Sequence, residues 1–214
     1  MLYLGACPVS LPLPVRSFSL PTHPKPWRLP VQGLSVFHGE GEATRLSHYF
    51  LPRVLAAGKQ ILYLDGANRI DPLLIARLAR QRGQQPSEYN RLIQVARAFT
   101  CFQLTELLAR VPRALQEFPA DIVIVTALPD LYFDEDVREA EARISFEQAL
   151  RRLRRLARQP LSVAVFSDAT TFATPRRRFF DQLTACADQV WRFEMRADSK
   201  PQLICERARP RLPY

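Results

Sequence analysis

The chain has 214 residues, of which 47% are hydrophobic and 24% are charged. This composition is typical of one globular domain with a substantial core, and it excludes an intrinsically disordered chain. The net charge is +9, most of the excess lies in residues 137–214, and all but three of the 30 basic residues are arginine. Arginine favours bidentate contacts with phosphate, so the charge indicates either a polyanionic partner or a compositional bias toward arginine.

Residues 1–33 are predicted to form an extended, proline-rich N-terminal arm. Seven of the 18 prolines fall within residues 8–30, a density that excludes regular helix and central strand. Such an arm can lie across a neighbouring subunit, which would make the protein a homo-oligomer, or it can be a solvated tail.

The sequence carries no signal for export or for a membrane. The first residues lack the basic and apolar regions of a signal peptide, and no apolar run approaches the length of a membrane span. The four cysteines have no metal-ligand spacing and indicate reduced thiols. We therefore expect a cytoplasmic protein without membrane contact.

From residue 34 onward, apolar strand-like runs alternate with helix-like runs. In chain order the predicted strands are 34–38, 61–64, 92–96, 121–125, 162–166, 189–193 and 202–206. The predicted helices between them are 44–57, 72–82, 101–111, 143–158 and 177–186. Continuous apolar strands that alternate with helices are typical of a mostly parallel sheet with helices on both faces. Residues 34–214 are therefore predicted to form one α/β domain.

The segment between the first strand and the first helix resembles a phosphate-binding loop without its phosphate-binding groups. A working loop reads G-x-x-x-x-G-K-[ST], in which glycine backbone N–H groups and the lysine hold the phosphates. With Thr44 at the Ser/Thr position, Ala43 takes the lysine position and Glu42 the preceding glycine position. Gly39 and Gly41 remain from the glycine-rich part, so the loop is degenerate and we expect no bound cofactor.

Three further segments make residues 34–195 similar to the RecA/RadA recombinase family. Residues 61–65 and the helix 73–80 resemble the family's second strand and following helix. Val95–Thr100, which includes Ala-Arg-Ala-Phe, resembles its strand-to-helix junction, and residues 121–136 occupy its Walker B strand and the loop beyond. The resemblance implies a RecA-like P-loop NTPase core.

The resemblance also shows which catalytic groups are absent from their expected positions. Besides Ala43 in place of the lysine, Ala67 stands where the family has its catalytic glutamate. The strand that should end in the Walker B aspartate runs into Thr126. Because hydrolysis of this type needs all three groups, we expect a pseudo-ATPase without catalytic residues or a metal site. An ATPase with a different site, using Arg45, is the remaining enzymatic alternative.

Two arginine groups are candidates for nucleic-acid binding. Arg176, Arg177 and Arg178 lie beside aromatic residues, where the family carries a DNA-contacting loop, and arginine beside aromatic rings suits single-stranded DNA. The structural alternative is a helix start with Phe179 and Phe180 buried. The second group shares one face of the helix 143–158 and consists of Arg151, Arg154, Arg155 and Arg158. Its structural alternative is a solvated helix face.

The residues thus predict a catalytically inactive RecA-like protein that binds single-stranded DNA as a recombination or repair accessory. It would act alone, as a homo-oligomer through the arm, or beside an active recombinase. The acids of residues 134–136 form either a solvated loop or a segment that masks the basic surface. The alternative function is a protein-interaction scaffold that docks an active recombinase or another ATPase without binding DNA.

Overall fold

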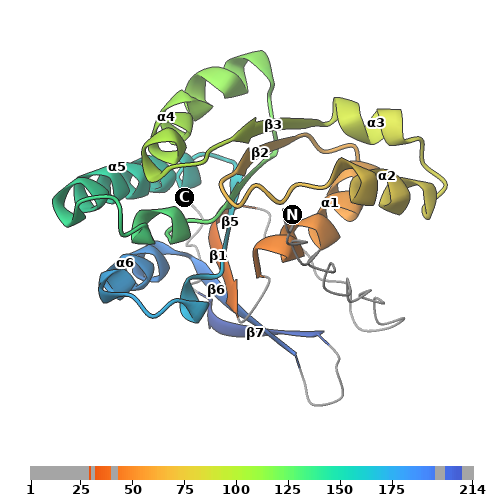
Figure 1. Cartoon of the computed structure of the whole chain (residues 1–214). Coiled ribbons are helices and arrows are strands. Elements are labelled where there is room, and N and C mark those ends of the chain that lie inside the picture. Colours follow the sequence, from red (N-terminus) through yellow and green to blue (C-terminus); the bar gives the residue numbers. More distant parts are fainter. Residues whose placement is uncertain (1–28, 30–31, 40–42, 196–200, 209–214) are drawn as a thin grey trace, which may run out of the picture.

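Seven strands form a single sheet at the centre of the molecule. The structure is a computed structural model that describes residues 29, 32–39, 43–195 and 201–208. The strands are β1 (Gly33–Gly39), β2 (Ile61–Asp65), β3 (Ile93–Arg97), β4 (Ile122–Thr126), β5 (Ser162–Ser167), β6 (Gln189–Met195) and β7 (Pro201–Ala208). Their order is β3-β2-β4-β5-β1-β6-β7 (Figure 1), with β7 antiparallel to β6 and every other pair parallel.

Helices connect the strands and cover the sheet. The α-helices are α1 (Ser47–Ala56), α2 (Pro72–Arg80), α3 (Pro86–Arg91), α4 (Cys101–Glu117), α5 (Glu139–Ala157) and α6 (Arg178–Cys186). Short 3-10 turns complete the connections: η1 (Ala43–Leu46), η2 (Asp130–Phe133), η3 (Ala169–Thr171) and η4 (Pro175–Arg177). Among the described residues, no helix has the length and apolarity needed to cross a membrane.

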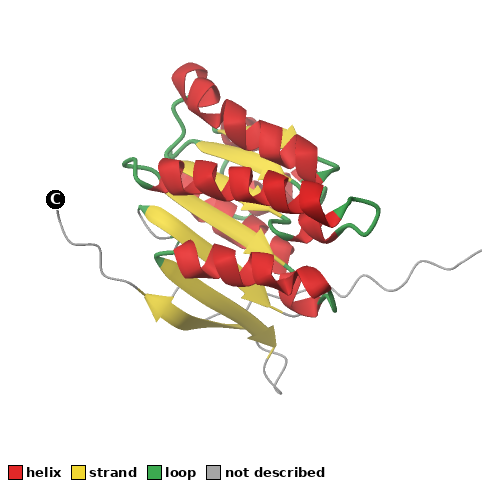
Figure 2. Ribbon diagram, turned by 90° about the vertical axis from the view of Figure 1, so that its left-hand side faces the viewer, coloured by secondary structure: helices red, strands yellow, loops and turns green. Residues whose placement is uncertain are grey.

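The strand order places the helices in two layers. The chain moves in one direction along the sheet from β1 to β2 to β3, and in the other direction from β3 to β4, β5 and β6. Because crossovers between parallel strands are right-handed, the two directions put their helices on opposite faces. Helices α1–α3 accordingly cover one face, and α4–α6 lie side by side on the other (Figure 2).

Each face of the sheet has its own apolar core, because successive strand residues point to opposite sides. Val36 packs toward α4–α6 whereas its neighbour Phe37 packs toward α1–α3. On the α4–α6 side, Phe146 of α5 stacks on Phe179 of α6 with ring centroids 4.7 Å apart. Burial of one such ring contributes roughly 1.5–3 kcal/mol. The two cores explain why every residue of β1, β2, β4 and β5 is buried.

The predicted α/β class with a mostly parallel sheet is confirmed, and the largest differences concern three helices. Helix α5 begins at Glu139, four residues before the predicted start at residue 143. Helix α4 continues six residues past the predicted end at Val111, through Pro112. Pro112 is exposed, so its ring stays in solvent while the flanking apolar residues pack on the core. Helix α3 was not predicted; within it only Tyr89 is buried, so no apolar periodicity marks it. The Tyr89 hydroxyl donates to the carbonyl of Pro52, at 3.0 Å.

The predicted N-terminal arm falls almost entirely outside the described residues. Of residues 1–33, only Leu29, Gln32 and Gly33 are described, and Gly33 already belongs to β1. Gly41 of the degenerate loop also lies outside the described residues.

Candidate functional site

The carboxyl ends of β1 and β5 form the place in this sheet where a ligand is expected. The two strands are neighbours, but β1 continues into η1 and α1 on one face and β5 into α6 on the other. In open α/β sheets, ligands bind in the crevice beyond strand ends at such a switch point. We call this place, between Thr44 on one side and Ser167–Thr170 on the other, the crevice.

A carboxylate of the protein itself bridges the crevice. Asp168 accepts hydrogen bonds from the backbone N–H of Thr44, at 3.3 Å, and from its hydroxyl, at 2.8 Å. Thr44 lies in η1, which runs directly into α1, and free N–H groups at such a helix start favour an anion. The Asp168 carboxylate is that anion here, so the N–H and hydroxyl of Thr44 are both occupied within the chain.

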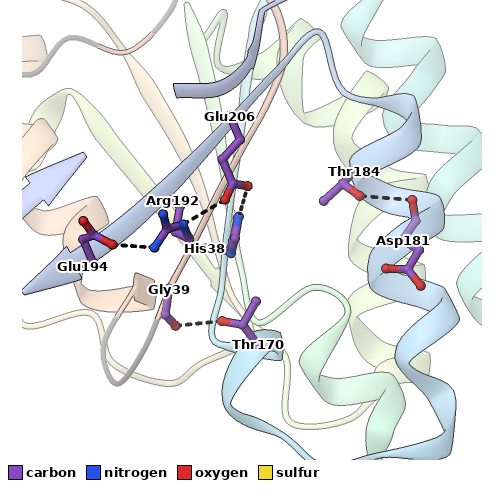
Figure 3. Close-up of polar contacts among 8 residues, drawn as sticks. All are labelled: His38, Gly39, Thr170, Asp181, Thr184, Arg192, Glu194 and Glu206. Atoms are coloured by element: carbon purple, nitrogen blue, oxygen red, sulfur yellow. Dashed lines mark hydrogen bonds and ion pairs between the residues drawn. The ribbon is translucent and has the colours of Figure 1, made fainter. Parts of the chain in front are cut away.

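A second contact closes the crevice at Gly39. The hydroxyl of Thr170 donates to the carbonyl of Gly39, at 3.1 Å (Figure 3). A Cβ atom added at Gly39 would lie 2.2 Å from the carbonyl oxygen of Phe193 on β6. The glycine is thus required by the close approach of β6, and its presence in the sequence is no sign of phosphate binding.

Asp130 fixes the position of Asp168. Its carboxylate accepts hydrogen bonds from the Ser167 hydroxyl, at 2.5 Å, and from the backbone N–H of Asp168, at 2.8 Å. Burial raises the pKa of Asp130 to about 6, although these two hydrogen bonds favour the charged form, and the nearby Asp168 charge adds to the rise. Because both donors belong to the β5 end, Asp130 supports the bridge between Asp168 and Thr44.

The three positions where the family resemblance led us to look for catalytic groups hold side chains with structural contacts. Ala43 is fully buried. The hydroxyl of Thr126 donates to the Asp65 carboxylate, at 3.2 Å, and accepts from the N–H of Ala67, at 3.1 Å. Asp65 is buried and also accepts from two backbone N–H groups of the loop after β2. Within the described ranges, no three His, Cys, Asp or Glu side chains gather as they would around a metal ion.

A buried histidine beside the crevice belongs to a network that joins the edge of the sheet to β1. The ring Nε2 of His38 lies 2.8 Å from Glu206 on β7, and Glu206 also accepts from Arg192 on β6, at 2.8 Å (Figure 3). Arg192 is paired in turn with Glu194. Desolvation works to raise the pKa of Glu206, but the hydrogen bonds and charges of His38 and Arg192 outweigh it and lower the pKa. The network holds β6 and β7 against β1.

The three consecutive arginines have different environments. Arg176 is buried, and its guanidinium donates to the backbone carbonyls of Tyr132, Asp134 and Val137. It holds the acidic loop after β4 and offers no surface to a nucleic acid, which corrects the prediction that all three arginines form a binding loop. The reason is that three backbone carbonyls of this loop face the guanidinium, which local sequence does not reveal.

Arg177 and Arg178 remain nearer the surface. Arg177 is half-buried; it donates to the carbonyl of Ala169, at 3.2 Å, and lies over the Phe180 ring. Arg178 is exposed but forms an ion pair with Glu139, the first residue of α5. Phe179 and Phe180 are buried, as the structural alternative predicted. One acidic side chain, that of Glu139, therefore already offsets part of the charge at this loop.

The arginines of α5 form a separate group. Arg151, Arg154, Arg155 and Arg158 are all exposed, and we call them the α5 ridge. Helix geometry places Arg151 and Arg158 about 18 and 28 Å along the axis from Glu139, the partner of Arg178. The α5 ridge therefore lies apart from Arg178 along the helix, and the structure does not join the two candidate groups into one surface.

Sequence reasoning missed Asp168 and Asp130, the two carboxylates that organise the crevice. Asp168 directly follows the end of a strand, which is a weak signal for a crevice residue, but its partner Thr44 is 124 positions away. Neither the scan against protein-family models nor the search of curated proteins found a match to this chain.

Proposed function

We propose that the protein is a RecA-like pseudo-ATPase that binds single-stranded DNA as a recombination or repair accessory. The observation that carries the proposal is the hydrogen-bonded bridge from Asp168 to Thr44. It places a negative charge against the donors that would otherwise face a phosphate. A nucleotide would have to displace this carboxylate, and no lysine is present at the loop position that assists phosphate binding.

The topology supports a RecA-like core as the finer description of the fold. The segment that resembles the phosphate-binding loop follows β1, and the segment that resembles the Walker B strand is β4. Strand β5 alone separates them in the sheet, so the loop after β1 and the end of β4 face the same edge. Contacts from Asp130, just after β4, to the residues after β5 link these segments directly.

The DNA-binding part is supported by the α5 ridge. Its four arginines are exposed, and none forms an ion pair with another described residue. Exposed, unpaired arginines bind phosphate groups with little regard to base sequence and release counterions when they do. An accessory that coats or delivers a single strand needs this kind of contact.

Fluorescence anisotropy of a labelled single-stranded oligonucleotide tests the proposed function. We expect binding that weakens steeply as salt rises. A parallel thermal-shift assay with millimolar Mg-ATP should show no stabilisation. Salt-insensitive or absent DNA binding would contradict the DNA role, and a clear shift with Mg-ATP would contradict the pseudo-ATPase.

The alternative function, a scaffold for a recombinase or another ATPase, is favoured by a different observation. Strand β3 is an edge strand, and apolar side chains on and just after it are exposed: Val95, Phe99 and Phe102. Open strand edges and exposed apolar groups are typical of protein–protein contacts. Tight binding to a recombinase without any DNA affinity would select this alternative.

A further inference from the structure

One surface of α5 is hollowed as well as basic. Four side chains line a hollow of about 370 Å³ on this helix: Gln148, Arg151, Arg152 and Arg155. We call it the α5 hollow. Residues spaced three and four apart share a helix face, so the four donors point to one side of α5. The lining includes three guanidinium groups and one amide, and no acid.

Arg152 gives the hollow a fixed wall. It is half-buried, and its guanidinium donates to the backbone carbonyl of Thr105 on α4. Thr105 is itself held by Ser145 of α5, with the two hydroxyl oxygens 2.7 Å apart. The hollow therefore lies on the α4 side of the helix, and one of its arginines is positioned before any ligand arrives.

The pairing of arginines elsewhere on α4 and α5 shows that the hollow is unusual. Arg110 and Arg113 on α4 each form an ion pair with a glutamate one turn away, and Arg143 on α5 approaches Glu147 at 3.9 Å. In the part of the chain that the structure describes, neither Arg152 nor any arginine of the α5 ridge has such a partner. This stretch therefore presents uncompensated positive charge.

Helix formation does not explain this charge, and the helix dipole explains only the part carried by Arg154 and Arg155, which lie in the last turn of α5. Arg151 and Arg155 are four residues apart, as are Arg154 and Arg158, and like charges at this spacing destabilise a helix. The negative end of the helix dipole favours cations only within the last turn. Helix α5 ends at Ala157, so Arg151 and Arg152 lie too early for that effect. A bound anion would remove the repulsion.

We propose that the α5 hollow and the adjoining ridge form a binding site for the phosphodiester backbone of single-stranded DNA. The proposal rests on the proposed function and names the place where the strand is held. Phosphate oxygens match the guanidinium fork, and successive turns of the ridge are about 5 Å apart, so neighbouring arginines contact different phosphates. No aromatic ring lines the hollow, so bases are not read and binding is independent of sequence.

The site lies away from the crevice and from the loop that the family resemblance suggested. Arg178 pairs with the first residue of α5, whereas the hollow occupies its second half. The two surfaces can therefore be changed independently.

The test compares three double variants with the wild-type protein by anisotropy of a labelled oligothymidine across a salt series. Arg151→Gln with Arg155→Gln empties the hollow of two charges. Arg110→Gln with Arg113→Gln makes the same change in net charge on α4 and is the matched control. Arg177→Gln with Arg178→Gln removes two positive charges from the start of α6, where the family resemblance suggested a DNA-contacting loop. Circular dichroism and thermal melting confirm that each variant is folded.

We expect the hollow variant to lose about tenfold or more in affinity and to lower the salt slope by about 1.4, since each phosphate contact to a single strand contributes about 0.7. The control should change affinity less than about twofold. Equal losses in the hollow variant and the control would overturn the proposal, because net charge alone would explain them. Unchanged binding by the hollow variant would overturn it and leave DNA binding itself intact.

A separate probe distinguishes DNA from small phosphates. Thermal shift with pyrophosphate is measured on the wild type and the hollow variant. One outcome is that the wild type shows a pyrophosphate shift but no DNA binding, and that the hollow variant shows no pyrophosphate shift. The hollow is then a site for small anions, and the assignment to DNA is overturned together with the proposed function.

Discussion

Thr44 donates both its backbone N–H and its hydroxyl to Asp168. Hydrogen bonds to a charged acceptor contribute more than neutral ones, about 1.5–3 kcal/mol each. Asp168 thereby ties the start of α1 to the end of β5 and fills the anion position at the same time. The side chain is a stabilising contact and, in the proposed pseudo-ATPase, also the obstacle to a phosphate.

Replacing Asp168 by Ala should expose the donors of Thr44 to an added anion. We expect a loss of stability of about 1–3 kcal/mol, together with a larger stabilisation by pyrophosphate than in the wild type. Thr44→Val is the control, because it removes one hydrogen bond but leaves the carboxylate in the crevice. Thermal shift with and without pyrophosphate measures both effects. A pyrophosphate shift of equal size in the wild type would show that Asp168 does not block the crevice.

Asp130 should make stability depend on pH in a definite direction. Its pKa is raised to about 6, above the ordinary value of about 3.9, so the native state binds more protons than the unfolded state between these values. Its contribution to stability is therefore complete below about pH 4 and is lost as the pH rises through about 6.

The variant Asp130→Asn isolates this effect. Its amide keeps the size of the carboxylate without the buried charge, so the stability of the variant relative to wild type should rise by about 2–3 kcal/mol between pH 4 and pH 7. Burial lowers the pKa of His48, but His48 is present in both proteins, so its contribution cancels in the difference. Urea unfolding across this pH range measures the difference, and parallel profiles would contradict the assignment.

The contacts of individual side chains were the part of the structure that the sequence predicted least well. Arg176, Arg177 and Arg178 are chemically identical neighbours, and only the carbonyls of the loop after β4 make Arg176 an internal residue. Asp168 could not be paired with Thr44 because that pairing depends on β1 and β5 being adjacent, which is a property of the strand order. The exposure of the α5 ridge, in contrast, followed from helical spacing alone.

Among the elements, the strong signals were the apolar runs. A helix was predicted from residue 101, and the hydroxyl of Thr100 accepts from the N–H of Gln103 at the start of α4. The buried strands β2, β4 and β5 were placed within one or two residues, because strands buried on both faces are continuous apolar runs. The end of α4 was misplaced because tertiary packing overrides the local effect of a proline.

Pro112 offers a direct test of that override. It lies inside α4 on the exposed side, where its ring prevents one backbone hydrogen bond. Pro112→Ala should restore the bond and stabilise the protein by about 1–3 kcal/mol, less the entropy that proline removes from the unfolded chain. Denaturant unfolding measures the change. A destabilised variant would mean that α4 depends on the altered geometry for its packing on α5.

In the molecule as a whole, the carboxyl ends and the amino ends of the parallel strands have different roles. The carboxyl edge carries the crevice, which the chain's own carboxylates close. The second half of α5 runs toward the opposite edge and carries the uncompensated arginines. An interface built from ridge residues therefore does not depend on what happens in the crevice, so DNA affinity should be independent of nucleotide.

The most direct test is the affinity of the wild-type protein for single-stranded DNA, measured by anisotropy from low to physiological salt, with and without Mg-ATP. We predict measurable binding, a steep fall in affinity with salt, and the same affinity whether or not Mg-ATP is present. Absent binding, or an affinity that changes with Mg-ATP, would contradict a DNA-binding protein with a closed nucleotide crevice.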